Sequence, residues 1–376
     1  MKRILVFVLC ALMVFSITAC GKKNTSNNEL IDKPTQDTSV STDKKGYDYL
    51  ASGADMYVPD KSKAEKVFRF AWTNTYDTDH PYSAVAAAFA TYVEEASEGK
   101  MVVELYPAAQ LGAERELFEM LLMGSLDFGI ISAPMVSNFS DATFGLEMPY
   151  IWGTDGTKAM SKMKKVLNSD IGNIILEGIE KDLDIKALSY AYQPFRHVWL
   201  NTKLNTWTDV AGLKLRSMEV DSNLKLWKAV GFSPVAMAFS DVYTQIQQRT
   251  IDGMESDYIG FYTNSLNEVC KYGYVSSHFN NTPIIFGASK NFESLNADEQ
   301  KIIRDASSHA SDWSYEVTER QEAIYRQKII DSGVEIFEMD LSPLIEKVQP
   351  MIKEYCEKSK ICESFVEAVK SEVEGK

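Results

Sequence analysis

The chain has 376 residues, of which 45% are hydrophobic and 11% aromatic, so it is long enough for about two to three domains with substantial cores. Its formal net charge of -14 argues against nucleic-acid binding, and we expect no nucleic-acid partner. An anionic ligand must therefore be held by a local positive site, because the field of the whole protein would repel it.

The N-terminal segment resembles a bacterial lipoprotein signal. A basic start precedes an apolar run from Ile4 to Ile17, which at roughly 14 residues is too short to span a membrane. Small residues then lead directly to Cys20. We expect residues 1–19 to be removed and Cys20 to carry lipid that anchors the protein to the membrane, outside the cytoplasm. The alternative is an uncleaved anchor, which the short apolar run disfavours.

Residues 20–65 are polar, rich in Lys, Asn, Ser, Thr and Asp, and show little apolar periodicity. Such a composition cannot bury enough surface to fold by itself. We therefore expect a disordered tether that holds the folded body at a short distance from the membrane.

The cysteines and histidines give no sign of a metal site. With Cys10 in the signal and Cys20 assigned to lipid, Cys270, Cys356 and Cys362 remain, without a C-x-x-C spacing. None of the four histidines has metal-ligand spacing, so we expect no metal and no cofactor. Cys356 and Cys362 flank a predicted break between two helices, where a disulfide could form outside the cell, although on one continuous helix they would point apart. The sequence leaves their pairing open.

Strand-like and helix-like segments alternate along the body in two halves, which is typical of an α/β fold that binds ligands beyond the carboxyl ends of its strands. In the first half we expect strands at 67–72, 101–106, 126–132 and 185–192, and helices at 82–96, 114–123 and 157–181. In the second half we expect a helix at 220–230, a helix at 241–248 capped by Ser240, a strand at 280–289, a long helix from 296 to about 333, and then a short strand and two helices.

Two short segments carry arginines with largely uncharged neighbours. They are 212–216, which ends at Arg216, and 193–197, which contains Arg196, and in both apolar residues alternate with polar ones as in a half-buried strand. A guanidinium suits a carboxylate because it offers two parallel charged hydrogen bonds at fixed geometry. We interpret both arginines as aimed at a buried anion. The alternative is an ordinary ion pair, and spacing alone does not decide between the two.

Several motifs, in matching order, resemble the substrate-binding proteins of TRAP transporters. They are YPAAQLGAE at 106–114, GSLD at 124–127, GLKLR at 212–216, MAFSDVY at 237–243 and IDGME at 251–255. The similarity extends over about residues 66–350.

The resemblance implies a two-lobed α/β fold of the periplasmic-binding-protein kind, type II-like, with a hinge and a long connecting helix. The expected lobe I comprises residues 66–193 and 282–321, and lobe II comprises 194–281 and 322–376. Such a receptor closes on a small organic acid and delivers it to the membrane permease subunits of the transporter. It makes and breaks no bond, so we expect no enzyme activity.

The resemblance also implies roles for individual residues. In the family, the arginine of the Gly-x-Lys-x-Arg motif holds the substrate carboxylate, which here is Arg216, and Arg196 supports that site. Phe239 occupies the position of an aromatic ring that packs on the ligand. Thr75 lies in the first polar loop, from which further polar contacts come.

The chain departs from the family pattern at four positions. Ser256 replaces a common asparagine, Glu219 replaces a neutral polar residue, and Ser132 and Met135 stand where the sialic-acid binders carry charges. We therefore expect a ligand with one carboxylate on Arg216, at most one weaker anionic group, and hydroxyl groups facing Thr75 and Ser132.

Two other functions remain open at this point. The same scaffold could signal to a membrane sensor kinase, or the chain could be an exported enzyme that orients an acid with its arginines. The sequence shows no catalytic triad context and no phosphate-binding loop, which disfavours the enzyme. A neighbouring kinase gene would favour the sensor, and measurable turnover of a bound acid would favour the enzyme.

Overall fold

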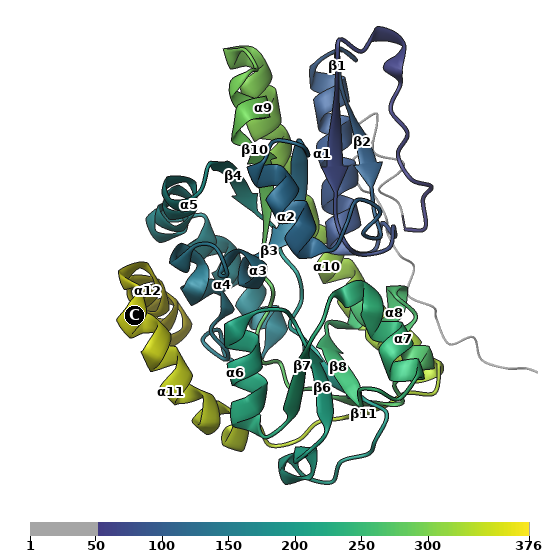
Figure 1. Ribbon diagram of the computed structural model, residues 1–376, viewed down its shortest axis with the longest axis vertical. Coiled ribbons are helices and arrows are strands. Elements are labelled where there is room, and N and C mark those ends of the chain that lie inside the picture. Colours follow the sequence, from purple (N-terminus) through teal and green to yellow (C-terminus); the bar gives the residue numbers. More distant parts are fainter. Residues whose placement is uncertain (1–51, 376) are drawn as a thin grey trace, which may run out of the picture. The chain divides into compact units, whose positions relative to one another are not determined.

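The computed structural model describes residues 52–375 (Figure 1). The predicted signal at 1–19, the lipid site at Cys20 and most of the predicted tether lie outside the described residues. The described end of that tether, 52–65, contains the 3-10 helix η2 (Lys61–Lys63). Its Tyr57 hydroxyl donates to Glu94, and Lys61 pairs with Glu104, so this stretch contacts the folded body.

Lobe I is built on a five-stranded mixed sheet, sheet A, with the order β2-β1-β3-β10-β4. Strands β1, β2 and β3 are parallel, whereas β10 runs antiparallel to both β3 and β4. The strands are β1 (Lys66–Ala71), β2 (Met101–Tyr106), β3 (Phe128–Ser132), β4 (Ile185–Tyr190) and β10 (Pro283–Ala288).

Helices cover both faces of sheet A. Along β1, Phe68 and Phe70 point to the face packed by α1 (Pro81–Ala96) and α10 (Ala297–Asp331). Ala71 points to the opposite face, which is packed by α2 (Glu114–Leu122), α4 (Gly156–Leu167) and α5 (Asp170–Asp182). This alternation is the two-residue period of a strand that is buried on both sides.

Lobe II is built on a second sheet, sheet B, with the order β11-β9-β5-β8-β6-β7. Its strands are β5 (His197–Leu200), β6 (Lys214–Ser217), β7 (Ser233–Ala236), β8 (Gly253–Ser256), β9 (Tyr272–Tyr274) and β11 (Glu335–Phe337). Val198 and Leu200 face a core shared with α6 (Asp221–Val230) and α11 (Ser342–Lys358). Trp199 faces the other core, with α7 (Val242–Gln247), α8 (Tyr258–Thr263) and the end of α10.

The remaining elements are short, apart from the last helix. They are α3 (Ala133–Val136), α9 (Ser289–Glu293), α12 (Lys360–Glu374) and the 3-10 helices η3 (Asp141–Glu147), η4 (Trp207–Val210), η5 (Phe239–Asp241) and η6 (Leu266–Glu268).

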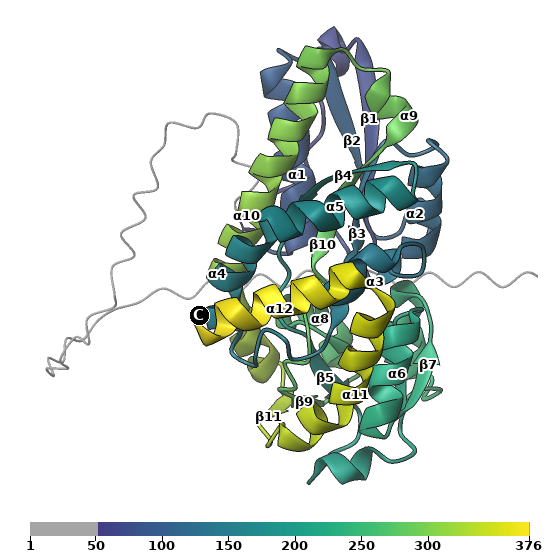
Figure 2. The ribbon, with the colours of Figure 1, turned by 90° about the vertical axis from the view of Figure 1, so that its left-hand side faces the viewer.

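The lobes are joined by segments 191–196 and 275–282 and by α10. The two segments run together, since Ala191 N donates to Pro283 O at 2.7 Å and Arg196 N donates to Phe279 O at 2.9 Å. Helix α10 is 35 residues long, close to the predicted helix from 296 to about 333, and it begins at a capping box of Asn296 and Glu299. Figure 2 shows it descending from the far end of lobe I toward lobe II.

The fold class is confirmed as two-lobed α/β, while the predicted lobe boundaries stay a prediction. The prediction assigned 322–376 to lobe II, and within that range α11 packs on α6, whereas α12 packs on α4, α5 and η3.

Three local predictions were wrong. The helix expected at 157–181 is two helices, because the chain turns at Asn168 so tightly that a side chain on Gly172 would lie 1.9 Å from Leu167 O. The strand expected at 193–197 begins only at His197, since the preceding residues form the connection between the lobes. Ser240 caps no helix, because it lies inside η5, which runs directly into α7.

Candidate functional site

The carboxyl ends of strands from both sheets meet at a cleft between the lobes. Three adjoining pockets in this cleft share Thr73, which follows β1, and Phe239 of η5. The two inner pockets also share Glu114, Arg216 and Met218, and each has a cavity volume of only about 30 Å³. The outer pocket measures about 200 Å³. Each inner pocket thus has room for only about two water molecules in this conformation.

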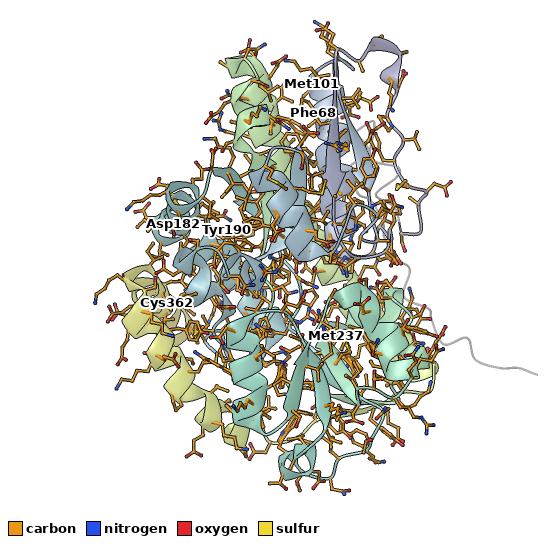
Figure 3. The ribbon with its side chains drawn as sticks, in the orientation of Figure 1. Phe68, Met101, Asp182, Tyr190, Met237 and Cys362 are labelled. Carbon is orange, nitrogen blue, oxygen red and sulfur yellow. The ribbon has the colours of Figure 1, made fainter. Side chains whose placement is uncertain are left out.

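Arg216 lies at the centre of the inner pockets. Strand β6 carries it, and its side chain is 5% exposed. Its Nε donates to Met237 O at 3.1 Å, and its guanidinium carbon lies 5.6 Å from the centre of the Phe239 ring. The carbonyl and the ring fix the direction of the guanidinium. In Figure 3, Met237 lies in lobe II close to the level where the lobes meet.

Arg196 is paired much more closely than Arg216. Its Nε donates to Glu255 Oε2, and its Nη2 donates to the Glu255 carbonyl oxygen at 2.6 Å. His278 Nε2 lies 3.5 Å from the same carboxylate. Burial alone would raise the pKa of Glu255, but Arg196 and His278 outweigh it and lower that pKa to about 2.

Glu255 reaches this position because its strand, β8, lies very close to β5. A side chain on Gly253 would lie 2.1 Å from Trp199 O, so only glycine allows β8 to approach β5 this closely. The Ile251 to Glu255 motif thereby positions the carboxylate between the two arginines.

Among the described residues, no carboxylate lies within hydrogen-bond distance of the Arg216 guanidinium. Glu255 is bonded to Arg196, while Arg216 Nη1 lies 3.7 Å from Glu255 Oε1, beyond hydrogen-bond distance. Burial lowers the pKa of Arg216 to about 10, against the opposing effect of Glu255. Arg216 remains charged at neutral pH, so a second anion in the pocket would stabilise it.

Glu114 is a second carboxylate in the inner pockets and was not among the predicted site residues. It is the first residue of α2, and its Oε1 accepts a hydrogen bond from Ser132 N at 2.8 Å. Burial raises its pKa, while Ser132 and Arg216 act in the opposite direction. The pocket therefore contains an acceptor beside the cationic Arg216.

Two amide oxygens add further acceptors. Gln193 Oε1 and Asn281 Oδ1 are buried, line the second inner pocket and have no hydrogen-bond partner among the described residues. Buried acceptors without a partner are unfavourable, and a ligand hydroxyl group would satisfy them. Both residues lie on the connections between the lobes.

The other predicted residues are distributed over the cleft. Phe239 borders all three pockets, Ser256 lines an inner pocket beside Arg196, and Glu219 lines the other. Thr75 lines the outer pocket and donates to Thr263 O at 3.1 Å. Ser132 lines none of the three pockets, because its hydroxyl group caps α3.

Sequence reasoning missed Glu114, Gln193, Asn281 and Met218. Glu114 and Gln193 each carried a signal, since one ends the YPAAQLGAE motif and the other begins the segment that contains Arg196. Asn281 and Met218 carried none, because only the fold brings them to the cleft.

The profile of the bacterial extracellular solute-binding proteins of family 7, DctP, matches residues 73–359. The chain belongs to this family. The sialic acid-binding periplasmic protein SiaP of Vibrio cholerae is 28% identical over 270 residues, which cover 72% of this chain and 83% of that protein. The chain is thus an extracytoplasmic solute-binding protein of the DctP family.

Two solved structures of TRAP periplasmic solute-binding proteins share the fold. The protein from Sulfitobacter, with bound β-D-galacturonate, is 25% identical, with a TM-score of 0.75 over 81% of this chain and 99% of that one. The protein from Bordetella bronchispeptica, with density assigned to pantoate, is 26% identical, with a TM-score of 0.74 over 81% and 98% of the two chains.

The described part of this DctP-family chain contains neither a metal-binding cluster nor a membrane-spanning helix. Between residues 52 and 375, no group of three or more His, Cys, Asp or Glu side chains could hold a metal ion. In the same range, no helix combines the length and apolar character needed to cross a membrane.

Proposed function

We propose that this DctP-family protein is the substrate receptor of a TRAP-type transporter, and that it captures a small hydroxylated monocarboxylate and delivers it to the membrane permease. The observation that carries this proposal is Arg216, a buried and charged guanidinium in the cleft whose nearest carboxylate is already bonded to Arg196. A ligand carboxylate would complete this pairing through the two-bond geometry that a guanidinium offers.

The acceptors around Arg216 favour hydroxyl groups on the ligand. Glu114, Gln193 and Asn281 each present an oxygen to the inner pockets, and hydroxyl groups would donate to them. The acids of the two similar structures are of this kind, since galacturonate and pantoate each combine one carboxylate with hydroxyl groups. We therefore place the ligand in the class of sugar acids and related hydroxy acids.

The carboxylates that line the first inner pocket disfavour a second carboxylate on the ligand. Glu219 and Glu114 would repel it, and Met135 offers no positive charge in the same pocket. Sialic acid and C4-dicarboxylates should accordingly bind more weakly than a neutral-bodied hydroxy acid.

Binding requires movement of the lobes. Inner pockets of about 30 Å³ are too small for an organic acid, so the lobes must separate to admit it and close around it. A ligand that contacts Arg216 in lobe II and Glu114 in lobe I stabilises the closed form through contacts that the open form lacks.

The proposal includes attachment to the membrane through Cys20 after removal of residues 1–19. Replacing Cys20 by serine should release the protein from the membrane fraction or leave the signal uncleaved. If the C20S variant fractionates and migrates like the wild type, the protein is held in another way.

Calorimetry with a panel of acids tests the proposed ligand class. We expect binding of D-galacturonate, pantoate or a related hydroxy monocarboxylate, and weaker or no binding of sialic acid and succinate. A bound acid should also raise the melting temperature, because it binds only the folded state. Tight binding of sialic acid would contradict the proposed class, and turnover of a bound acid would support the enzyme alternative.

A further inference from the structure

A single residue, Ser359, separates the two C-terminal helices and forms a break between them. Helix α11 ends at Lys358 and α12 begins at Lys360, while Ser359 between them is extended, with φ -132° and ψ 120°. Its backbone N–H donates to Tyr355 O at 3.1 Å, and its hydroxyl group accepts from Cys362 N at 3.3 Å. Ser359 therefore caps one helix and starts the next.

This break lies between α11, which packs on lobe II, and α12, which packs on both lobes, because Cys362 and Val366 near its start belong to the core of α11. Leu344 and Val348 of α11 share a core with α6 and sheet B. Phe365 and Val369 of α12 share a core with α4, α5 and sheet A. Figure 2 shows α12 below α5, with α11 continuing away from it past α6. The angle at Ser359 is thus linked to the relative position of the lobes.

Two cysteines face each other across the break. Cys356 lies in the last turn of α11 and is half-buried, and Cys362 lies in the first turn of α12 and is fully buried. Their sulfur atoms are 3.6 Å apart. On an unbroken helix, residues six apart would lie roughly 120° apart around the axis, so the break itself brings the thiols together. Figure 3 shows Cys362 on the side of the molecule where these helices lie.

We propose that Cys356 and Cys362 form a disulfide bond in the extracytoplasmic protein, and that this bond limits bending at Ser359 as the lobes open and close. The formation of the bond rests on the location shared by the family, since exported proteins meet oxidising conditions. The effect on bending rests additionally on the lobe movement proposed above.

Thiol–disulfide exchange with an oxidised protein dithiol would make the bond. The more exposed Cys356 attacks one sulfur of the oxidant's disulfide as the thiolate, which forms a mixed disulfide and releases one oxidant thiolate. Cys362, as its thiolate, then attacks Cys356 Sγ and displaces the second oxidant thiolate. In sum, the two cysteines lose two electrons and two protons, and the oxidant's disulfide becomes two thiols.

Peptide mapping tests the bond without any ligand. Protein isolated from the cell envelope is denatured in the presence of an alkylating reagent, with no reductant, and then digested with trypsin. Because Lys358 and Lys360 lie between the cysteines, cleavage leaves peptides 354–358 and 361–370 joined only by the disulfide. We expect the joined pair, which should separate after reduction. Recovery of both peptides as alkylated thiols would overturn the proposal, whether or not the protein binds an acid.

Hydrogen exchange tests the effect on the break. Reduction, or replacement of Cys356 by serine, should speed amide exchange in 355–363 by roughly tenfold or more, because the break loses its covalent restraint. The C270S variant serves as the matched control, since Cys270 is buried in a different core and should leave this exchange unchanged. Equal exchange in oxidised wild type, reduced wild type and C356S would show that the bond does not restrain the break.

Discussion

At the residue scale, Arg196 and Arg216 lie in the same cleft but differ in how their charges are matched. The Arg196 side chain donates to both the carboxylate and the backbone carbonyl oxygen of Glu255, whereas Arg216 keeps only a long contact with the same carboxylate. A buried, paired arginine stabilises the fold because its loss strands the partner charge. Burying an arginine without a close partner costs desolvation free energy, and an anionic ligand can offset this cost.

This difference predicts opposite outcomes for two alanine variants. Arg216→Ala should abolish measurable acid binding, with a loss of roughly a hundredfold to several thousandfold, corresponding to about 3 to 5 kcal/mol. Without ligand, the free energy of unfolding of this variant should be nearly the same as that of the wild type. Arg196→Ala should lower that free energy by about 3 to 5 kcal/mol, because Glu255 is left unpaired.

Calorimetry and urea unfolding of both variants would check the prediction. Arg216→Lys is the matched control and should recover little affinity, since an ammonium group lacks the two parallel donors. Full acid affinity in Arg216→Ala, or equal destabilisation by the two alanine variants, would contradict the proposed division of roles.

The sequence predicted the importance of these arginines but not their environment. The Gly-x-Lys-x-Arg motif pointed to Arg216, and the alternating pattern around it matched β6. The pairing of Glu255 with Arg196 could not be read from the sequence, because it depends on the close approach of β8 to β5 at Gly253. The unpaired oxygen of Asn281 likewise becomes visible only when the connection between the lobes is seen.

At the scale of elements, the contact between η3 and α6 contains a carboxyl group that should remain protonated at neutral pH. Ser222 Oγ donates to Glu147 Oε2 at 2.6 Å, and Glu147 Oε1 is buried without a hydrogen-bond partner among the described residues. Burial raises the pKa of Glu147 to about 8, with Ser222 and Ser137 acting against it and nearby Asp221 adding to it.

This raised pKa predicts a pH-dependent loss of stability. The folded pKa lies above the ordinary value of 4.5, so the unfolded chain releases this proton first as the pH rises. The contribution of Glu147 is therefore fully present below about pH 4.5, falls between about 4.5 and 8, and then stays constant. At about 1.4 kcal/mol per pKa unit, the loss is on the order of a few kcal/mol.

Glu147→Gln should remove this dependence while keeping the contact with Ser222. Urea unfolding at pH 5, 6.5 and 8 should show the variant gaining stability relative to the wild type as the pH rises. Glu219→Gln is the control, since that side chain is exposed at the cleft. A constant difference between Glu147→Gln and wild type across this pH range would contradict the assignment.

Element positions were predicted best where strong periodicity and local caps agreed. Helix α10 shows both, with a capping box at Asn296 and an apolar stripe. The division of the expected 157–181 helix was missed because the apolar spacing continues across Asn168, where α4 ends before α5 packs on β4. Short strands such as β8 and β9 were missed because four residues or fewer carry little periodic signal.

At the scale of the whole molecule, the alternation of strands and helices predicted two α/β halves, and the family resemblance implied two lobes, but neither predicted how the chain passes between them. The connections at 191–196 and 275–282 carry Gln193, Arg196, His278 and Asn281, so the segments that join the lobes also contribute to the proposed binding site. In the proposed mechanism, ligand contacts and lobe movement would therefore be coupled through the same residues.

This coupling predicts that the ligand makes the particle more compact. Without ligand, the lobes should populate open forms, because Gln193 and Asn281 are better satisfied by water than by a dry, closed pocket. Small-angle scattering with a saturating bound acid should show a smaller radius of gyration, by on the order of 1 Å in roughly 20 Å. Arg216→Ala at the same acid concentration should keep the larger radius, because it lacks the contact that stabilises closure. An unchanged radius for the wild type at saturation would mean that the acid binds without lobe closure. The narrow inner pockets would then have to open by local side-chain movement instead.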